Sequence, residues 1–329
     1  GGGYDTNQDN DPVIASDSKG RAIYVVDLLT GSLVKLFSVI EYPDMTYSIP
    51  SDIAKVDTDG NGKVDRLYVC DMGGRMWRFD IGNSDVNQWT AKIIFTSNLS
   101  SSDRRKIFYP PDVTLERDST GNYEMIYFGT GDRESPKESA VINRLYAVKD
   151  KNLVDKNPQT PYTENDLVDV TSDELQNPST TQSRKNEILN QLKEKSGWYI
   201  ILENSSEKSL STPVVFYRTA YFTTFTASSE AQQQVGDPCY VGEGTAKIYA
   251  LKYNTGNAVF DFDLTNDIDG TVISKTDRSL IMGTAIPSGV IITFVGGKAV
   301  AYAGVGGGVY SPQLSGTSPL IPMTWRVVF

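Results

Sequence analysis

The sequence predicts an all-β fold of the β-propeller type. Short runs of alternating apolar and polar residues, bounded by turn residues, fill most of the chain, and patterns of helical period are scarce. Several of these runs also repeat one form, a small apolar strand with a tyrosine near its centre. The tyrosines concerned are Tyr24, Tyr68, Tyr146, Tyr249 and Tyr302. Some intervals between them match the roughly 40–50 residues of one four-stranded propeller blade.

Each repeat is expected to form a β-hairpin. Asn-Thr-Gly or Gly-Gly follows the first strand, where a tight turn needs residues that tolerate positive φ. The predicted hairpins comprise residues 22–37, 67–81 and 248–260, and a looser copy precedes the glycine-rich residues 304–308. A single blade cannot bury its own apolar face, so radial stacking of blades would complete the core.

The chain is expected to form one propeller domain over residues 1–329, interrupted by two insertions. Residues 150–196 are polar and contain a run of helix formers, which predicts a loop insertion with a short helix. The apolar residues expected on one face of that helix are Ile188, Leu189 and Leu192. Residues 228–244 are expected to be an exposed loop. The abrupt start with three glycines predicts a domain excised from a larger chain. The sequence contains no run of 18 apolar residues, so no transmembrane segment is expected.

Composition excludes several classes of function. Lys and Arg number 31 against 41 Asp and Glu, and the net charge of −10 argues against nucleic acid as the main ligand. The chain has no histidine, which excludes Ser-His-Asp triads, Cys-His dyads and histidine-ligated zinc, copper or haem. Its two cysteines, Cys70 and Cys239, are too far apart for a C-x-x-C motif. They could form one disulfide or remain buried thiols.

The sharpest chemical signal is an acidic loop over residues 57–65. Oxygen-bearing side chains stand at loop positions 1, 3, 5 and 9, and position 7 would offer a backbone carbonyl, as in a calcium loop. These residues are Asp57, Asp59, Asn61, Asp65 and, for the carbonyl, Lys63. Three carboxylates so close together would repel one another without a cation. The sequence therefore predicts a Ca²⁺ site here.

The loop departs from an EF-hand in two respects. Position 6 is Gly62, as the sharp bend requires, but position 12 is Tyr68 instead of a bidentate Glu. No flanking helices are expected, since a strand follows. We therefore predict an EF-hand-like loop on a β-scaffold, with a dissociation constant of about 10⁻⁶ to 10⁻⁴ M. The alternative is a polar hairpin loop without a metal.

Other polar clusters are weaker candidates. The acidic residues at 5–11 could begin a metal loop but lack a glycine bend, and a solvated arm is the expected interpretation. A third acidic run is expected to be a strand and turn without a metal; it comprises Asp261, Asp263, Asp267 and Asp269. Asp132 and Glu134 could be the paired carboxylates of a glycosidase, although a structural loop is the expected interpretation.

Several motifs, taken in order along the chain, resemble the C-terminal domain of the PilC/PilY family of type IV pilus tip-associated factors. The calcium loop and its hairpin, Asp57 to Asp80, are the first. The others are residues 109–113 with 126–131, 197–199 with 207–208 and 211–216, 221–225 with 237–239 and 248–251, 286–289, and 325–326. The motifs span nearly the whole chain.

The resemblance implies a modified seven-bladed β-propeller with one calcium site. It also implies a non-enzymatic role in pilus biogenesis, in which the protein supports extension by opposing retraction and aids twitching motility, host-cell adhesion and virulence. The implied partners are pilus subunits or minor pilins, the assembly machinery and a host-cell receptor. The implied location is the bacterial cell surface at the pilus tip, outer-membrane associated or periplasmic in transit.

Two other functions remain open at this point. One is a carbohydrate- or host-receptor-binding propeller. The other is a quinoprotein-like dehydrogenase, although the sequence has neither an adjacent cysteine pair nor a dense set of tryptophans to enclose a quinone.

Overall fold

The computed structural model describes residues 1–10, 16–100, 102–153, 160–228, 244–265 and 272–314. The chain divides into two compact units. Unit 1 comprises Gly1–Phe128 and Lys149–Asn165, and unit 2 comprises Gly129–Val148 and Asp166–Met323. Thr324–Phe329, which are grouped with unit 1, lie outside the described residues.

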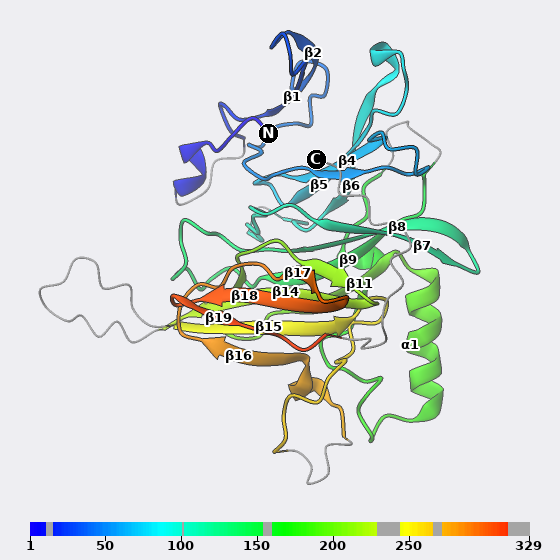
Figure 1. Ribbon diagram of the computed structural model, residues 1–329, viewed down its shortest axis with the longest axis vertical. Coiled ribbons are helices and arrows are strands. Elements are labelled where there is room, and N and C mark those ends of the chain that lie inside the picture. Colours follow the sequence, from blue (N-terminus) through cyan, green and yellow to red (C-terminus); the bar gives the residue numbers. More distant parts are fainter. Residues whose placement is uncertain (11–15, 101, 154–159, 229–243, 266–271, 315–329) are drawn as a thin grey trace, which may run out of the picture. The chain divides into compact units, whose positions relative to one another are not determined.

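Unit 1 consists of antiparallel strands and short 3₁₀ turns (Figure 1). Its 3₁₀ helices are η1 (Thr6–Asp9), η2 (Val86–Gln88) and η3 (Glu164–Asp166). The strands that begin in it are β1 (Ala22–Val26), β2 (Leu33–Ser38), β3 (Ala54–Val56), β4 (Arg66–Cys70), β5 (Arg75–Asp80), β6 (Thr90–Thr96), β7 (Asp112–Asp118) and β8 (Gly121–Gly129). β1 and β2 form a two-stranded ribbon, β3 to β6 form a sheet in sequence order, and β7 pairs with β8.

The apolar core of unit 1 joins the ribbon to the four-stranded sheet. Ile23 and Phe37 from the ribbon pack in one cluster with Val69, Trp77 and Phe79 from β4 and β5. The rings of Phe37 and Phe79 meet edge to face, with their centroids 4.9 Å apart. β4 is buried along its whole length and β5 along all but its first residue, so both faces of the sheet are covered at this point.

A buried ionic network occupies the polar side of the same two strands. The Arg78 guanidinium donates to Asp80 Oδ1 at 2.8 Å and to Asp150 Oδ2 at 2.9 Å. Arg66 donates to Asp80 Oδ1 at 3.0 Å and also contacts Glu124. Both arginines also donate to the backbone carbonyl of residue 153, at 2.8 Å from Arg66 and 3.1 Å from Arg78. Buried charges are tolerated only when they are paired and hydrogen-bonded, and this network meets both conditions.

Unit 2 carries more strands and one α-helix. Its helices are α1 (Gln182–Glu194) and the 3₁₀ turn η4 (Lys275–Arg278). Its strands are β9 (Arg144–Asp150), β10 (Val168–Asp169), β11 (Gly197–Ile201), β12 (Lys208–Ser209), β13 (Val214–Phe216), β14 (Thr219–Ala227), β15 (Gly244–Lys252), β16 (Ser279–Gly283), β17 (Ile291–Val295), β18 (Lys298–Val305) and β19 (Gly308–Tyr310). β11 lies between β9 and β10, β14 and β15 form the centre of a second sheet, and β17, β18 and β19 form a third.

The expectation of seven blades is wrong for the part of the chain that the structure describes. These residues form four sheets of three or more strands and one two-stranded ribbon. The longest interval between the repeated tyrosines, from Tyr146 to Tyr249, could have held extra blades or an insertion; it holds η3, helix α1 and several short strands that join neighbouring sheets. β12 and β13, for example, both pair with β14. Strand spacing in the sequence cannot distinguish a new blade from a second strand on an existing edge.

The predicted strand over residues 258–260 is also absent. Residue Ala258 makes only an isolated bridge to Leu251. The side chain of Gln176 takes both backbone groups of Ala258: its amide donates to the carbonyl at 3.0 Å, and its oxygen accepts the N–H at 2.8 Å. A distant amide side chain thus replaces the strand partner that the hairpin pattern predicted.

Residues 150–196 contain more than a loop and a helix. α1 lies where a helix was expected, capped by Thr181, whose hydroxyl accepts the N–H of Arg184. Ile188 and Leu192 are buried, but Leu189 is 46% exposed. Strand β10, from the same segment, pairs with β11 in parallel, so the segment contributes to a sheet. The predicted loop at 228–244 lies almost wholly outside the described residues.

Cys70 is buried and its thiol is free. Burial raises the pKa of this thiol well above its usual value, with a smaller contribution from Asp71. Cys239 lies outside the described residues. None of the described helices has the length and apolar character that a bilayer-spanning helix needs.

Removing one member of the ionic network should destabilise unit 1. We expect Arg78→Leu to lower the free energy of unfolding by about 3–5 kcal/mol, because Asp80 and Asp150 would remain buried without their partner. Arg184→Leu is the matched control, since its ion pair with Glu174 is partly exposed and screened by solvent, and its loss should change the free energy of unfolding little. Urea unfolding followed by tryptophan fluorescence measures both. Equal losses in the two variants would contradict the role given to the network.

Candidate metal centre

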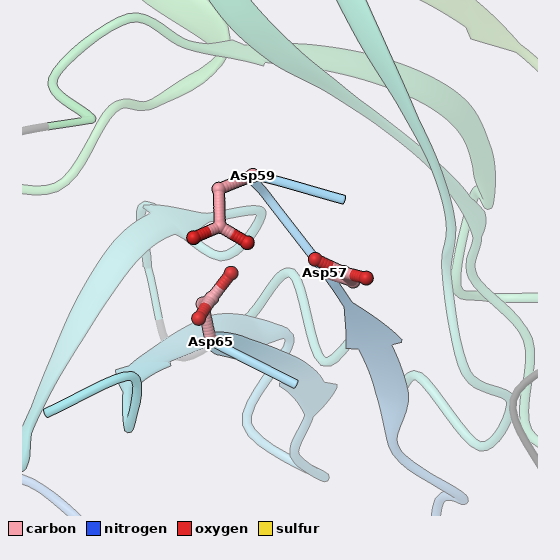
Figure 2. A group of neighbouring side chains, drawn as sticks. All are labelled: Asp57, Asp59 and Asp65. Atoms are coloured by element: carbon pink, nitrogen blue, oxygen red, sulfur yellow. The ribbon is translucent and has the colours of Figure 1, made fainter. Parts of the chain in front are cut away.

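The acidic loop connects two neighbouring strands of one sheet (Figure 2). β3 and β4 are antiparallel partners, with Val56 opposite Arg66. The residues that flank this pair, Asp57 and Asp65, therefore lie beside each other, and the Asp65 N–H donates to the Val56 carbonyl at 2.9 Å. Rigid strands thus fix both ends of the loop.

The loop brings three carboxylates together. Asp57, Asp59 and Asp65 each offer an oxygen, and these oxygens all lie within 4.8 Å of one another. Among the described residues, this is the one group of at least three such acidic or thiol ligands at that separation. Asp59 is exposed and the other two are half-buried. In Figure 2 the side chains of Asp59 and Asp65 point toward each other across the loop.

Backbone donors hold Asp57 in place. Its carboxylate accepts the N–H groups of Gly60 at 2.7 Å, Gly62 at 2.7 Å and Asn61 at 3.1 Å. Partial burial works against ionisation, but these donors outweigh it and lower the pKa of Asp57 below its ordinary value. The carboxylate is therefore anionic at neutral pH and is already oriented by the curled backbone.

The remaining predicted ligands also lie in this loop. The Asn61 amide donates to Asp59 Oδ2 at 2.8 Å, and Asn61 Oδ1 accepts the Lys63 N–H at 2.8 Å. Asn61 is therefore beside the carboxylates, although its oxygen is turned to the backbone. The role of the Lys63 carbonyl as a metal ligand remains a prediction.

Sequence reasoning missed two residues beside Asp65, one that donates hydrogen bonds to it and one that packs closely against it. Thr58 donates both its N–H and its hydroxyl to Asp65 Oδ2, each at 2.8 Å. Gly82 lies so close that a Cβ there would stand 2.8 Å from Asp65 Oδ1. The threonine at loop position 2 could have been noticed as a donor within the loop. Nothing in the sequence marks Gly82, because it approaches Asp65 only through the fold.

The structure adds little support for the other polar clusters as metal or catalytic sites. Asp5 caps η1 and accepts from Ser18 and Lys19, so its carboxylate serves the backbone. Asp11, from the same acidic run, lies outside the described residues, as do Asp267 and Asp269. In the glycosidase candidate, Asp132 Oδ1 accepts the N–H of Glu134 at 3.0 Å, which is a turn interaction.

The bend at Gly62 should tolerate few side chains. Its φ of +89° lies in the region that favours glycine, and so does the +73° of Gly60. We expect Gly62→Ala to lower the free energy of unfolding by about 1–2 kcal/mol. Gly62→Asn should lower it less, because asparagine tolerates positive φ. Thermal unfolding compares the two, and equal losses would mean that strain at φ is not the cause.

Because of Asp5, the free energy of unfolding should depend on pH in the acidic range. The N–H of Asn7, the Ser18 hydroxyl and further backbone donors lower its pKa, although burial opposes them. An acid with a lowered pKa in the folded state contributes stability above its unfolded pKa of about 4, and the contribution is lost as the pH falls further. We expect Asp5→Asn to be less stable than the wild type at pH 7, with the gap closing toward pH 2. Melting temperatures measured across that range test this, and a constant gap would contradict it.

Comparisons with known proteins agree with one another. A family model described as the PilY1 beta-propeller domain matches residues 3–133. A type IV pilus biogenesis factor PilY1 homolog from Xylella fastidiosa is 24% identical over 268 residues, which cover 74% of this chain and 17% of that protein. Type IV pilus biogenesis factor PilY1 from Pseudomonas aeruginosa is 23% identical over 337 residues, which cover 82% of this chain and 28% of that protein. The chain thus spans less than a third of the length of these curated relatives.

A solved structure extends the likeness to the fold. The crystal structure of the Pseudomonas aeruginosa PilY1 C-terminal domain matches with a TM-score of 0.56 and 15% identity, over 88% of this chain and 66% of that one. The prediction of an all-β propeller architecture is therefore confirmed. The predicted resemblance to the C-terminal domain of the PilC/PilY family is therefore confirmed: residues 3–133 match the PilY1 beta-propeller model, and the chain is similar in sequence and in fold to PilY1 proteins.

Proposed function

We propose that the acidic loop binds one Ca²⁺ ion. Asp57, Asp59 and Asp65 would supply carboxylate oxygens, and the Asn61 side chain and the Lys63 carbonyl would complete the ligand set. The observation that carries the proposal is the gathering of three carboxylate oxygens within 4.8 Å. Ca²⁺ prefers six to eight hard oxygens, and protein and water would share them here.

The ion would act mainly by removing repulsion. Like charges about 4 Å apart repel by about 1 kcal/mol per pair in water and by more where the site is shielded. The loop continues directly into β4, whose first residue, Arg66, belongs to the buried ionic network. Calcium would therefore hold the loop in one conformation on a strand that is already rigid.

We further propose that the chain is the propeller portion of a type IV pilus biogenesis factor, without catalytic activity. The support is that both curated relatives are type IV pilus biogenesis factors and that residues 3–133 match a PilY1 domain. In this role the domain would support pilus extension by opposing retraction, with effects on twitching motility, host-cell adhesion and virulence. Its partners would be pilus subunits, minor pilins, the assembly machinery and a host-cell receptor, at the cell surface or pilus tip.

Calorimetric titration of the metal-stripped chain with Ca²⁺ tests the site. We expect one site in the wild type, with a dissociation constant of about 10⁻⁶ to 10⁻⁴ M, and no measurable binding in Asp65→Ala. The matched control is Asp27→Ala, because Asp27 also accepts backbone N–H groups in an exposed turn but belongs to no carboxylate group of this kind among the described residues.

Two results would contradict the calcium proposal. One is the absence of binding by a stripped wild type that remains folded by circular dichroism. The other is loss of binding in Asp27→Ala to the same degree as in Asp65→Ala. The cellular role needs a separate readout: surface pili and twitching zones in a strain that carries Asp65→Ala in the full-length protein. Wild-type piliation and twitching in that strain would show that the acidic loop is not needed for the proposed cellular role.

A further inference from the structure

The acidic loop contains an asparagine followed by a glycine, Asn61 and Gly62, and no other Asn-Gly pair occurs in the sequence. In such a pair the backbone nitrogen of the glycine can attack the side-chain carbonyl carbon of the asparagine. Glycine favours this attack because it has no Cβ to crowd the nitrogen. The products are a cyclic imide and ammonia. The loop therefore carries a residue pair that can modify itself without an enzyme.

The structure places a partner on each of the three groups that react. The nucleophile is the Gly62 nitrogen, whose N–H donates to Asp57 Oδ2 at 2.7 Å. The electrophile is the Asn61 side-chain carbonyl, whose oxygen accepts the Lys63 N–H at 2.8 Å. The leaving group is the Asn61 amide nitrogen, which donates to Asp59 Oδ2 at 2.8 Å. Because one end of the amide accepts and the other donates, these partners fix its orientation.

Two of these contacts assist the attack directly. The Asp57 carboxylate can accept the proton that the Gly62 nitrogen loses. The Lys63 N–H stabilises the negative charge that develops on the Asn61 oxygen, as an oxyanion-hole donor does. Asn61 and Gly62 are both exposed, so water can reach the imide once it has formed.

We propose that Asn61 is a site of spontaneous deamidation, which the fold of the loop promotes and bound calcium slows. The Gly62 nitrogen forms a bond to Asn61 Cγ and gives its proton to Asp57. The bond between Cγ and the amide nitrogen then breaks, and ammonia leaves with that proton, returned through solvent. Water opens the imide at one of its two carbonyls, which yields aspartate or isoaspartate. The net reaction consumes one water and releases one ammonia.

Deamidation would change both the charge and the length of the loop. Aspartate at position 61 keeps the backbone and adds a fourth carboxylate, and ligand charge is one determinant of calcium affinity. Isoaspartate instead lengthens the backbone by one methylene group. The effect of calcium rests on the proposed metal site. There Asp57 and the Asn61 oxygen would bind the ion in place of Gly62 and Lys63, so the attack would lose the groups that assist it.

Peptide mapping of the whole chain tests the proposal. The chain is incubated at 37 °C in EDTA, and trypsin digestion with mass spectrometry measures the conversion of amide to acid at each asparagine. We expect Asn61 to convert at least tenfold faster than Asn83, which is also exposed but precedes a serine. Excess Ca²⁺ should slow the conversion of Asn61 at least threefold and leave that of Asn83 unchanged.

Two variants separate the effect of the fold from that of the local sequence. Asp57→Asn removes the proton acceptor on Gly62 and should slow conversion of Asn61 at least fivefold in EDTA. Asp65→Asn is the matched control, because Asp65 belongs to the same group of carboxylates but accepts from Thr58. It should change the rate less than twofold.

Three outcomes would overturn the proposal. The first is conversion of Asn61 no faster than that of Asn83 in EDTA. The second is equal slowing by Asp57→Asn and Asp65→Asn. The third is an equal rate at Asn61 with calcium and with EDTA, in a chain that binds Ca²⁺ by calorimetry. If calorimetry detects no binding, the proposed metal site fails, but the measurements in EDTA still show whether the loop promotes deamidation.

Discussion

The ionic network of Arg66 and Arg78 is the constraint on which unit 1 depends. Two guanidinium groups and the carboxylates of Asp80, Glu124 and Asp150 are enclosed together, all of them less than a tenth exposed. Separating any one of them would leave a charge buried without compensation. The network therefore ties β4 and β5 to Glu124 of β8 and to Asp150, the last residue of β9, within this unit.

The acidic loop gains its geometry from this rigid base. Its two ends continue strands that already pair, so its backbone can curl tightly and direct N–H groups at Asp57. Such a loop is pre-organised: the carboxylates are gathered before a cation arrives, and little ordering is left to oppose binding. The missing bidentate glutamate and the exposure of Asp59 keep the expected affinity moderate.

The two units differ in the chemistry that they offer. Unit 1 gathers carboxylates at its surface, where a divalent cation is the natural complement. Unit 2 instead gathers cations that are each paired with a carboxylate: Lys247 with Glu207, Lys275 with Glu203 and Arg278 with Asp173. A net charge of −10 describes neither group, because local charge depends on which side chains the strands bring together.

The sequence by itself determined the all-β class, the hairpin turns and the acidic loop. All three rest on local rules: alternation along a strand, positive φ at glycine, and ligand spacing within nine residues. The tertiary structure decided the number of sheets in the described residues, the loss of the strand at Ala258 and the close approach of Gly82 to Asp65. It alone brought Lys247 and Arg278 to one pocket. These features depend on contacts between residues far apart in the chain. Local sequence patterns do not show which distant side chains will be in contact.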